Sequence, residues 1–265
     1  MKKVLITGAT DGIGLETAKL LAAKGNHLIM HGRSDHKLQS ACEQVKQHAP
    51  DVKIDTYLAD LSSLIDSRKL ARSILKEHSK IDVIINNAGV FKLPQPITQD
   101  GFDARFVVNT FAPAIITELL LPVLSEDSRI VNLSSAAQAP VQVDAMKGLV
   151  HLNDDFQAYA QSKLALTIWS ERVSKTLKPR QVSVSVNPGS LLASKMVKEG
   201  FGVAGNDLSI GAQILCKAAL SDEFQQASGK YFDNDSQQFA SPHNFALNAV
   251  NCQKVMEALQ SVVAG

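Results

Sequence analysis

Cysteine is scarce in this sequence, and so are the long apolar segments typical of membrane proteins. The 265 residues include three cysteines, Cys42, Cys216 and Cys252, which lie far apart and form no CxxC pair. This pattern argues against a disulfide framework and a cysteine-based metal site. The apolar residues after Lys3 give way at once to polar residues and glycine, unlike a signal peptide, and we identify no apolar run of the roughly 20 residues that cross a bilayer. We therefore expect a cytoplasmic protein with no metal and no membrane partner.

A strong charge of either sign is also absent. The 27 basic and 26 acidic residues leave a formal charge of +1, which gives no electrostatic footprint for nucleic acid or an anionic membrane surface. Neither a repeat nor a linker divides the chain, and α/β domains often reach about 250 residues as one unit. We expect a single domain over residues 1–265 and no nucleic-acid partner.

What the sequence does contain is an alternation of short β-branched runs with amphipathic stretches of helical length. Lys3–Thr7 predicts a first strand, and Ile13–Lys24 predicts a first helix that ends before Gly25. Further strands are expected at Leu28–His31, Val52–Leu58, Ile81–Asn86, Arg129–Leu133, Val182–Asn187 and Lys230–Phe232, and helices at 36–48, 66–78, 101–124, 158–177 and Phe245–Val263. Several strands are apolar nearly throughout, as strands buried on both faces are. The pattern predicts an α/β fold with a parallel sheet and helices on both faces.

A glycine-rich turn joins the first predicted strand to the first predicted helix. Glycine permits a tight turn and lets the backbone approach a pyrophosphate, while a helix N-terminus offers free N–H groups and a positive dipole. Any tight turn uses glycine, but a strand–turn–helix junction near the N-terminus is the context that a dinucleotide site requires. The residues expected to bind the cofactor here are Gly8, Thr10, Asp11, Gly12, Ile13 and Gly14.

The end of the second predicted strand bears on the choice between NAD and NADP. A site for NAD normally carries an acidic residue there, which holds the ribose hydroxyls. Gly32 occupies that position, and Arg33 and Ser34 follow; the planar fork of an arginine suits a phosphate. Asp35 is a competing signal, since it could hold a ribose, and Arg33 could simply be solvated. We expect NADP(H) to be preferred over NAD(H).

Tyr159 and Lys163 lie four residues apart in a predicted helix, so they share one face. A tyrosine with a pKa near 10 is a poor acid–base group at neutral pH, and a neighbouring ammonium is expected to lower that pKa. Such a pair alone is common on exposed helices. Polar residues that end three predicted strands give it significance, because ligands of open α/β sheets bind at the carboxyl ends of strands. These residues, each of which could also be an ordinary turn residue, are Asn86–Gly89, Ser134–Ser135 and Asn187–Gly189.

Seven motifs follow one another along the chain: Thr7–Gly14, Asp60–Leu61, Asn86–Gly89, Asn109, Ser134–Ser135, Tyr159 with Lys163, and Pro188–Gly189. In this order they make the sequence resemble the short-chain dehydrogenase/reductase family over nearly its whole length. The resemblance implies a single doubly wound, Rossmann-type domain with a sheet of about seven parallel strands. It also implies hydride transfer to or from a nicotinamide.

The resemblance further implies a role for each residue of the motifs. Tyr159 would donate or accept the proton, and Ser135 would orient the substrate oxygen, with Ser134 as the alternative. Lys163 would hold the nicotinamide ribose and lower the pKa of Tyr159, while Asn109 would anchor a water that links Lys163 to solvent. The remaining cofactor contacts would be Asp60 and Leu61 at the adenine, Asn87, Ala88 and Gly89 at the adenosine, and Pro188 and Gly189 after the later strand.

Two departures from the family pattern concern the substrate end. Ser135 and Tyr159 are 24 positions apart (159 − 135), and this long spacer resembles the retinol-dehydrogenase-like branch, which acts on apolar alcohols and carbonyls. Ser194 stands near the place where the family usually has a threonine. Residues 190–206 resemble the family's substrate lid. Their apolar residues, with Phe91 and Leu93, are expected either to line an apolar pocket or to pack in the core.

Together these features predict an NADP(H)-dependent oxidoreductase acting on an apolar carbonyl or alcohol. We expect it to reduce an aldehyde or ketone with Tyr159 as the general acid. Oxidation of an alcohol is the alternative direction, and an NADP-binding sensor or scaffold without catalysis is the alternative class. Besides a small-molecule substrate, a second copy of the chain is a candidate partner, because family members often form homodimers or homotetramers through helices corresponding to 101–124 and 158–177.

Overall fold

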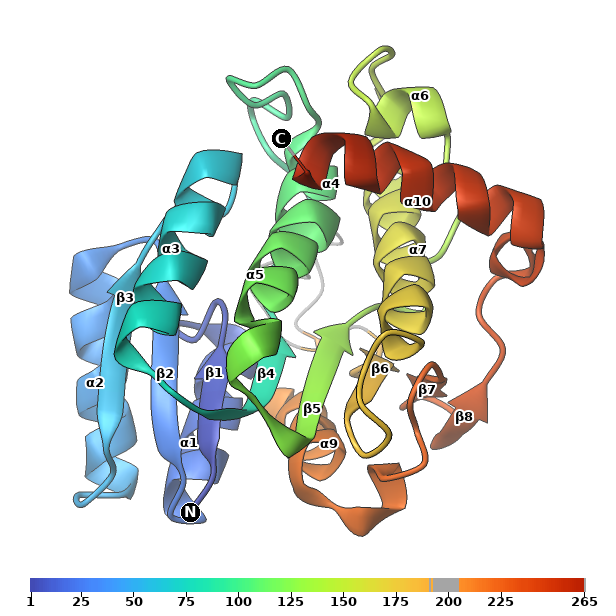
Figure 1. Cartoon of the computed structure of the whole chain (residues 1–265). Helices are drawn as coiled ribbons and strands as arrows, with labels where there is room; N and C mark the ends of the chain where they lie inside the picture. Colours follow the sequence, from blue (N-terminus) through green and yellow to red (C-terminus); the bar gives the residue numbers. More distant parts are fainter. Residues whose placement is uncertain (191, 193–204, 265) are drawn as a thin grey trace.

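One sheet forms the centre of the protein (Figure 1). The computed structural model describes residues 1–190, 192 and 205–264, and within them the sheet has eight strands in the order β3-β2-β1-β4-β5-β6-β7-β8. The strands are β1 (Lys3–Ile6), β2 (His27–Gly32), β3 (Ile54–Leu58), β4 (Ile81–Asn86), β5 (Leu124–Leu133), β6 (Val182–Asn187), β7 (Tyr231–Asp233) and β8 (Gln238–Ala240). The chain builds the sheet outward from β1 to one side and then from β4 to the other. This topology confirms the predicted doubly wound, Rossmann-type α/β fold.

Helices cover both faces of the sheet (Figure 1). One face carries α1 (Gly12–Ala23), α2 (Asp35–His48) and α9 (Leu208–Leu220), and the other carries α3 (Leu64–Glu77), α5 (Ala112–Leu120) and α7 (Asp155–Ser174). The remaining elements are α4 (Ala104–Phe106), the π-helical turn η1 (Val107–Phe111), η2 (Leu121–Val123), α6 (Val143–Met146), η3 (Asp222–Phe224), η4 (Asn244–Leu247) and α10 (Ala249–Val263).

The side chains of β1 show why the sheet needs helices on both faces. Val4 and Ile6 are fully buried in the cluster formed with α1, α2 and α9, whereas Leu5 between them is fully buried in the cluster formed with α3 and α5. Successive side chains of a strand point to opposite faces. Each fully buried residue of this size stabilises the fold by about 1.5–3 kcal/mol, so an apolar strand of this kind is stable only between two helical layers.

The sequence-based prediction lacks one strand and one long helix that the structure contains, β8 and α9. The sheet has an eighth strand, β8, which pairs antiparallel with β7; its three residues are too few to show a strand pattern. Helix α9 was not predicted either, and Gly211 in its interior is unfavourable for a helix. The structure explains this glycine, because a Cβ there would lie 2.7 Å from Cδ1 of Leu192 and 3.3 Å from the Ile13 side chain.

The helix predicted over 101–124 is divided into four parts. It begins at α4 with Asp103 as its N-cap, widens into the π-helical turn η1, and continues through α5 to η2. The strand that follows, β5, starts at Leu124, five residues before the predicted Arg129 (129 − 124). Periodicity alone does not detect a π-helical turn, because the turn shifts the apolar face without interrupting the apolar composition.

Among the described residues, one helical stretch, Ala104–Val123, is long and apolar enough to cross a membrane. The expectation that no such stretch exists was wrong, because mean hydropathy over a window tolerates isolated polar residues such as Asn109 and Glu118. In the structure, 72% of the apolar window is buried inside the fold. This burial is what the core helix of a globular domain shows.

The closing helix α10 lies across the ends of α4 and α7 (Figure 1). The Arg68 guanidinium of α3 donates to the last carbonyl oxygens of α10, at 3.3 Å to Val262 and 2.7 Å to Val263. The buried residues of α10 join the core cluster of α5 and α7: Cys252, Val255, Ala258, Leu259 and Val262. Assembly of two chains through 101–124 and 158–177 would therefore have to use the surface that α10 leaves open.

Candidate active site

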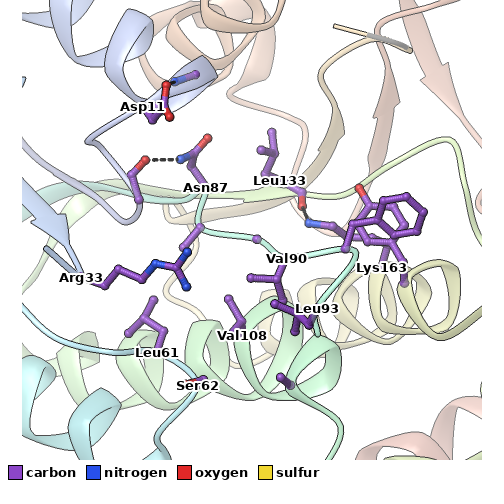
Figure 2. Close-up of a pocket in the computed structure, with 18 of the residues that line it drawn as sticks. Asp11, Arg33, Leu61, Ser62, Asn87, Val90, Leu93, Val108, Leu133 and Lys163 are labelled. Carbon is purple, nitrogen blue, oxygen red and sulfur yellow. Dashed lines mark hydrogen bonds between the residues drawn. The ribbon is translucent and has the colours of Figure 1, made fainter. Parts of the chain in front are cut away.

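The carboxyl ends of the parallel strands open into one large cleft, with a volume of about 1240 Å³ (Figure 2). In doubly wound sheets, ligands bind at this edge, where the strand order reverses. The predicted site residues that line the cleft are Gly8, Thr10, Asp11, Gly12, Ile13, Gly14, Arg33, Ser34, Asp60, Leu61, Asn87, Ala88, Gly89, Ser135, Tyr159, Lys163, Pro188 and Gly189. Residues that are far apart in the sequence therefore meet in one place, as their positions at strand ends predict.

The turn between β1 and α1 has a backbone conformation that glycine adopts readily. Gly8 and Gly12 have φ values of +66° and +55°. Gly14 has no room for a side chain, since a Cβ there would lie 2.3 Å from the Gly8 carbonyl oxygen and 2.4 Å from Nδ2 of Asn87. The Asn87 amide donates to the carbonyl oxygens of Thr7 (2.9 Å) and Gly8 (3.0 Å). The end of β4 thus holds the glycine-rich turn in place.

The N-terminus of α1 faces the cleft beneath this turn. Asp11 is its N-cap, and Oδ1 of Asp11 accepts the Gly12 N–H at 2.7 Å. Ile13 and Gly14, which follow in the first turn, also line the cleft. The first N–H groups of a helix have no helical carbonyl as partner, and the helix dipole is positive at this end. This end of the cleft therefore suits a pyrophosphate.

A buried histidine that the sequence analysis did not single out supports the turn from the neighbouring strand. The Gly8 N–H donates to Nδ1 of His31 at 3.2 Å, and Nε2 of His31 lies 3.1 Å from the Ala59 carbonyl oxygen. The ring is 3% exposed, and burial lowers the pKa of His31 to about 4. The neutral ring with its proton on Nε2 satisfies both contacts. The sequence signal that could have identified His31 is a polar residue within the otherwise apolar strand predicted at Leu28–His31.

The end of β2 combines a basic surface with a lack of room for an acidic side chain. A Cβ at Gly32 would lie 2.4 Å from Cγ2 of Thr10, so any side chain there requires Thr10 to move. Arg33 is exposed and lines the cleft with Lys37. Ser34 lines it as well and is the N-cap of α2, where its hydroxyl accepts the Lys37 N–H at 3.5 Å. Two cationic side chains thus stand at the strand end where NAD sites carry a carboxylate.

The two acidic residues near this end, Asp35 and Asp60, already have hydrogen-bond partners. Asp35 is not among the residues lining the cleft, and its carboxylate accepts from the Gln39 amide at 2.8 Å on the exposed side of α2. The competing signal for NAD therefore faces away from the site. Asp60 lines the cleft and accepts from the backbone N–H and the hydroxyl of Ser62, at 3.0 and 2.8 Å. Beside it, Leu61 is 4% exposed and gives the cleft an apolar wall.

Tyr159 and Ser135 meet at the other end of the cleft. Their side chains are hydrogen-bonded to each other, and the Ala137 N–H donates to the Ser135 hydroxyl oxygen at 3.0 Å. The neighbouring Ser134 is 2% exposed, and its hydroxyl lies 2.7 Å from that of Thr167. The geometry thus favours Ser135 over Ser134 as the hydroxyl that reaches a ligand.

The protonation of Tyr159 and Lys163 differs from what their spacing predicted. Burial raises the pKa of Tyr159, although the hydrogen bond with Ser135 acts in the opposite direction. The expected lowering by Lys163 is not found, because burial also lowers the pKa of Lys163, to about 7. The Lys163 ammonium donates to the Leu133 carbonyl oxygen at 2.6 Å and lies 5.7 Å from the centre of the Tyr159 ring. The phenol is therefore protonated at neutral pH, which is the form that a general acid must have before it donates.

Asn109 is buried in the π-helical turn η1 and is not among the lining residues. Its amide nitrogen donates to the Val90 carbonyl oxygen (3.0 Å) and the Ser162 hydroxyl (2.9 Å), and its oxygen accepts the Val90 N–H at 2.9 Å. The predicted role, anchoring a water, is therefore not open to its amide hydrogens. The side chain instead joins the segment after β4 to Ser162 of α7, three residues after Tyr159 (162 − 159).

The end of β6 is held by residues from the turn between β7 and β8, which the sequence analysis missed. The Asn234 amide donates to the Pro188 carbonyl oxygen at 2.8 Å, and Asp235 accepts the Ser190 N–H at 2.8 Å. Gly189 between them has a φ of +119°. Asn234, the donor, and Asp235, the acceptor, lie 46 and 45 residues after the residues that they hold, so no local pattern could reveal them.

Most of the proposed lid, residues 190–206, lies outside the described residues, and so does Ser194. The parts that the structure describes include Leu192, which is 3% exposed, lines the cleft and forms a β-bridge with Asn206. The apolar residues predicted after β4 do face the cleft, since both Phe91 and Leu93 line it. Their role in a lid-covered pocket remains a prediction.

The substrate end of the cleft is built from aromatic rings. Phe91 lies edge-on to Tyr159, with ring centres 5.2 Å apart, and edge-on to Phe156 at 6.5 Å. Phe156 lines the cleft and is 42% exposed. A small oxygen-bearing ligand placed against Tyr159 and Ser135 would be hydrogen-bonded twice, with apolar surface beside it. Such a site can transfer a proton to or from that oxygen.

Comparisons with known proteins agree with this geometry. The sequence model of the short chain dehydrogenase family matches residues 2–202. Retinol dehydrogenase 13 of Mus musculus is 32% identical over 260 residues, which cover 91% of this chain and 78% of the relative. Human polyprenol dehydrogenase is 30% identical, with 88% and 77% covered.

Solved structures with the same fold include a protein from Mycobacterium paratuberculosis, with a TM-score of 0.82, 26% identity and coverage of 100% of this chain and 94% of that one. Landomycin C-6 ketoreductase, solved with bound NADP and rabelomycin, has a TM-score of 0.69 and 26% identity, with 88% and 94% covered. The family binds a nicotinamide cofactor, and the cleft described above fits one. This chain therefore belongs to the short-chain dehydrogenase/reductase family, in its retinol-dehydrogenase-like branch, and is an oxidoreductase acting on CH–OH groups.

Proposed function

We propose that the protein is an NADP(H)-dependent reductase of apolar aldehydes or ketones, with Tyr159 as the general acid. One observation carries the proposal: the hydrogen-bonded pair of Tyr159 and Ser135 lies in the same cleft as Arg33 (Figure 2). Figure 2 places Arg33 and Lys163 on opposite sides of the cleft. An extended dinucleotide has a phosphate-bearing end and a reactive end, and this cleft offers a suitable partner for each.

The preference for NADP(H) rests on the end of β2. Gly32 lacks room for the carboxylate that NAD sites use, and the cations Arg33 and Lys37 line the cleft beside it. A 2′-phosphate would lie between these two side chains, and hydrogen bonds to charged groups contribute about 1.5–3 kcal/mol. At about 1.4 kcal/mol per factor of ten, that is roughly a ten- to hundredfold preference.

The proposed role of Tyr159 concerns the proton that accompanies the hydride. When bound, the nicotinamide supplies or takes up the hydride. Ser135, whose hydroxyl oxygen accepts the Ala137 N–H, orients the substrate oxygen. Tyr159 donates its proton to that oxygen, and burial keeps the pKa of this phenol raised, so that the proton is present at neutral pH. Reduction of a carbonyl requires this protonated phenol, whereas oxidation of an alcohol requires the phenolate.

The substrate class rests on the surface next to Tyr159. Phe91, Leu93 and Phe156 line this part of the cleft, and aromatic walls favour apolar ligands. Two relatives carry the names retinol dehydrogenase and polyprenol dehydrogenase, and both of these alcohols are apolar, which supports the same substrate class. A substrate panel of aromatic, aliphatic and small charged carbonyls tests this part of the proposal, and higher turnover of the charged compounds would contradict it.

Kinetics with both cofactors, in both directions, test the reaction itself. We expect kcat/KM to be highest for carbonyl reduction with NADPH. Arg33→Ala should reduce the ratio of the NADPH and NADH values by roughly ten- to hundredfold. Arg180→Ala is the matched control, since Arg180 is an exposed arginine that pairs with Asp127 and does not line the cleft. An unchanged ratio in Arg33→Ala would refute the assignment of the phosphate site.

The alternative, an NADP-binding sensor or scaffold without catalysis, is tested with the phenol. Tyr159→Phe should bind NADPH with the wild-type dissociation constant and lose nearly all turnover, because only the acidic hydroxyl is removed. Tight NADPH binding by a wild-type protein that reduces no carbonyl of the panel and oxidises no alcohol would favour the sensor instead.

A further inference from the structure

A buried ion cluster lies beside the substrate end of the cleft and has no part in the proposed reaction. The Arg105 side chain is 1% exposed. Its Nε and Nη2 atoms donate to the two carboxylate oxygens of Asp103, at 2.8 and 2.6 Å, and its Nη1 atom donates to Oδ1 of Asp155. All three nitrogen atoms of the guanidinium are therefore bound to carboxylates of two different segments.

The first of these segments forms a wall of the cleft. Asp103 is the N-cap of α4 and forms a β-bridge with Ile97. The loop between them is closed by hydrogen bonds from the Thr98 N–H to the Phe102 carbonyl oxygen (2.8 Å) and from the Ala104 N–H to the Pro96 carbonyl oxygen (2.7 Å). The residues of this loop and of α4 that line the cleft are Ile97, Thr98, Gln99, Asp100 and Ala104.

The second segment carries the phenol. Asp155 is the first residue of α7, and Tyr159 follows it by four residues, so both lie on one face of that helix, one turn apart. A second buried contact lies one turn further along, where Asn109 and Thr110 bind the hydroxyl and the carbonyl oxygen of Ser162, at 2.9 and 2.8 Å. Tyr159 is therefore placed between two fixed points of α7, and Arg105 provides the first.

Packing alone does not account for a charged group here. Removing a guanidinium from water has a large free-energy cost, and well-packed apolar residues often stabilise a fold equally well. The neighbouring Phe106 and Phe111 are already fully buried in the same region. What the planar fork provides is direction, because it fixes the angle between the two carboxylates that it joins.

We propose that Arg105 is a positioning residue, which holds the start of α7, and with it the Tyr159 hydroxyl, at a fixed distance from the cleft wall formed by 97–104. The inference rests on the proposed reductase function. It predicts a selective defect: the substrate end should be misplaced while the glycine-rich turn, which belongs to β1 and α1, keeps its shape.

The test compares Arg105→Lys with Arg129→Lys. Arg129 is a matched control, because it is also buried (4% exposed), donates to the Ala218 carbonyl oxygen at 3.0 Å, and does not line the cleft. A misplacement of about 1 Å can reduce a rate roughly a hundredfold. For Arg105→Lys we expect kcat to fall about ten- to hundredfold and the substrate KM to rise, with the NADPH dissociation constant unchanged within about twofold. For Arg129→Lys both kinetic constants should equal those of the wild type at temperatures where the protein is folded.

Asp155→Ala keeps the experiment decisive if Arg105→Lys does not fold. This substitution removes only the carboxylate on α7 that Arg105 binds. The Asp155 side chain is 39% exposed, and the N-cap of α7 is the neighbouring Asp154. It should lower kcat in the same direction without changing the dissociation constant for NADPH. Wild-type kcat and KM in both Arg105→Lys and Asp155→Ala would overturn the inference, and so would an equal loss in Arg129→Lys. A wild-type protein without turnover would instead refute the proposed function, and the positioning role with it.

Discussion

Acidification should destabilise this protein through His31, the buried ring that holds the glycine-rich turn. In the folded protein, burial lowers the pKa of His31 from 6.5 to about 4. Between these two values the unfolded chain binds the proton more tightly than the folded protein does. The contribution of the neutral ring to stability is therefore fully present above pH 6.5 and is lost as the pH falls towards about 4. Since the two pKa values differ by about 2.5 and each pKa unit corresponds to ~1.4 kcal/mol, the full loss is about 3.5 kcal/mol, of which roughly 3 kcal/mol is lost by pH 4.

The measurement is urea unfolding at a series of pH values between 7 and 4. Trp169, the only tryptophan of the chain, is 1% exposed, so its fluorescence reports the loss of the core. The His31→Gln variant isolates the contribution of one ring, because its amide can still accept from the Gly8 N–H and donate to the Ala59 carbonyl oxygen but does not titrate. We expect the variant to be less stable than the wild type at pH 7 and the difference to shrink by roughly 3 kcal/mol at pH 4.

His48→Gln is the matched control, since His48 is exposed and hydrogen-bonded within α2 to the Gln44 carbonyl oxygen at 3.0 Å. Its unfolding free energy should follow the wild-type pH dependence. Parallel curves for wild type and His31→Gln over the whole range would show that the buried ring does not resist protonation, and the argument would fail.

Three further predictions concern the glycine turn, the buried lysine and the closing helix. Gly14→Ala should weaken NADPH binding in a fluorescence titration and cost about 1–3 kcal/mol of stability, because its Cβ would lie 2.3 Å from the Gly8 carbonyl oxygen; wild-type affinity would contradict this. Lys163→Met should abolish turnover while urea unfolding without cofactor at pH 7 shows undiminished stability, because burial disfavours the Lys163 ammonium. Arg68→Ala should cost about 1–3 kcal/mol in urea unfolding, since it removes the hydrogen bonds to the end of α10, whereas Arg72→Ala, an exposed change on the same helix, should cost less than about 0.5 kcal/mol.

The sequence was informative wherever the determinant is local. The glycine-rich turn, the spacing of Tyr159 and Lys163, and the polar residues at strand ends are all short patterns, and the structure places them in one cleft. Apolar strands with helices between them predicted the doubly wound fold. These features follow from steric and helical geometry over a few residues, so the sequence predicts them without knowledge of the tertiary structure.

Other features depend on contacts between distant segments. β8 exists only because β7 offers an edge to pair with, and the π-helical turn η1 places Asn109 where it reaches Ser162 on α7, 53 residues later (162 − 109). The raised pKa of Tyr159 is a further case, because burial raises it and also lowers the pKa of the neighbouring Lys163 to about 7. These pKa values depend on how deeply the folded protein buries each group, which the spacing of two residues in the sequence does not reveal.

The sequence by itself determined the class of fold, and it predicted the place of the cofactor and the reacting phenol. Only the tertiary structure decided which groups support them: His31 beneath the turn, Asn234 behind β6, and Arg105 between the cleft wall and α7. The physical reason is that a reactive group must carry a particular chemistry at a particular local spacing, whereas a supporting group needs only to arrive at the right point in space, from any position along the chain.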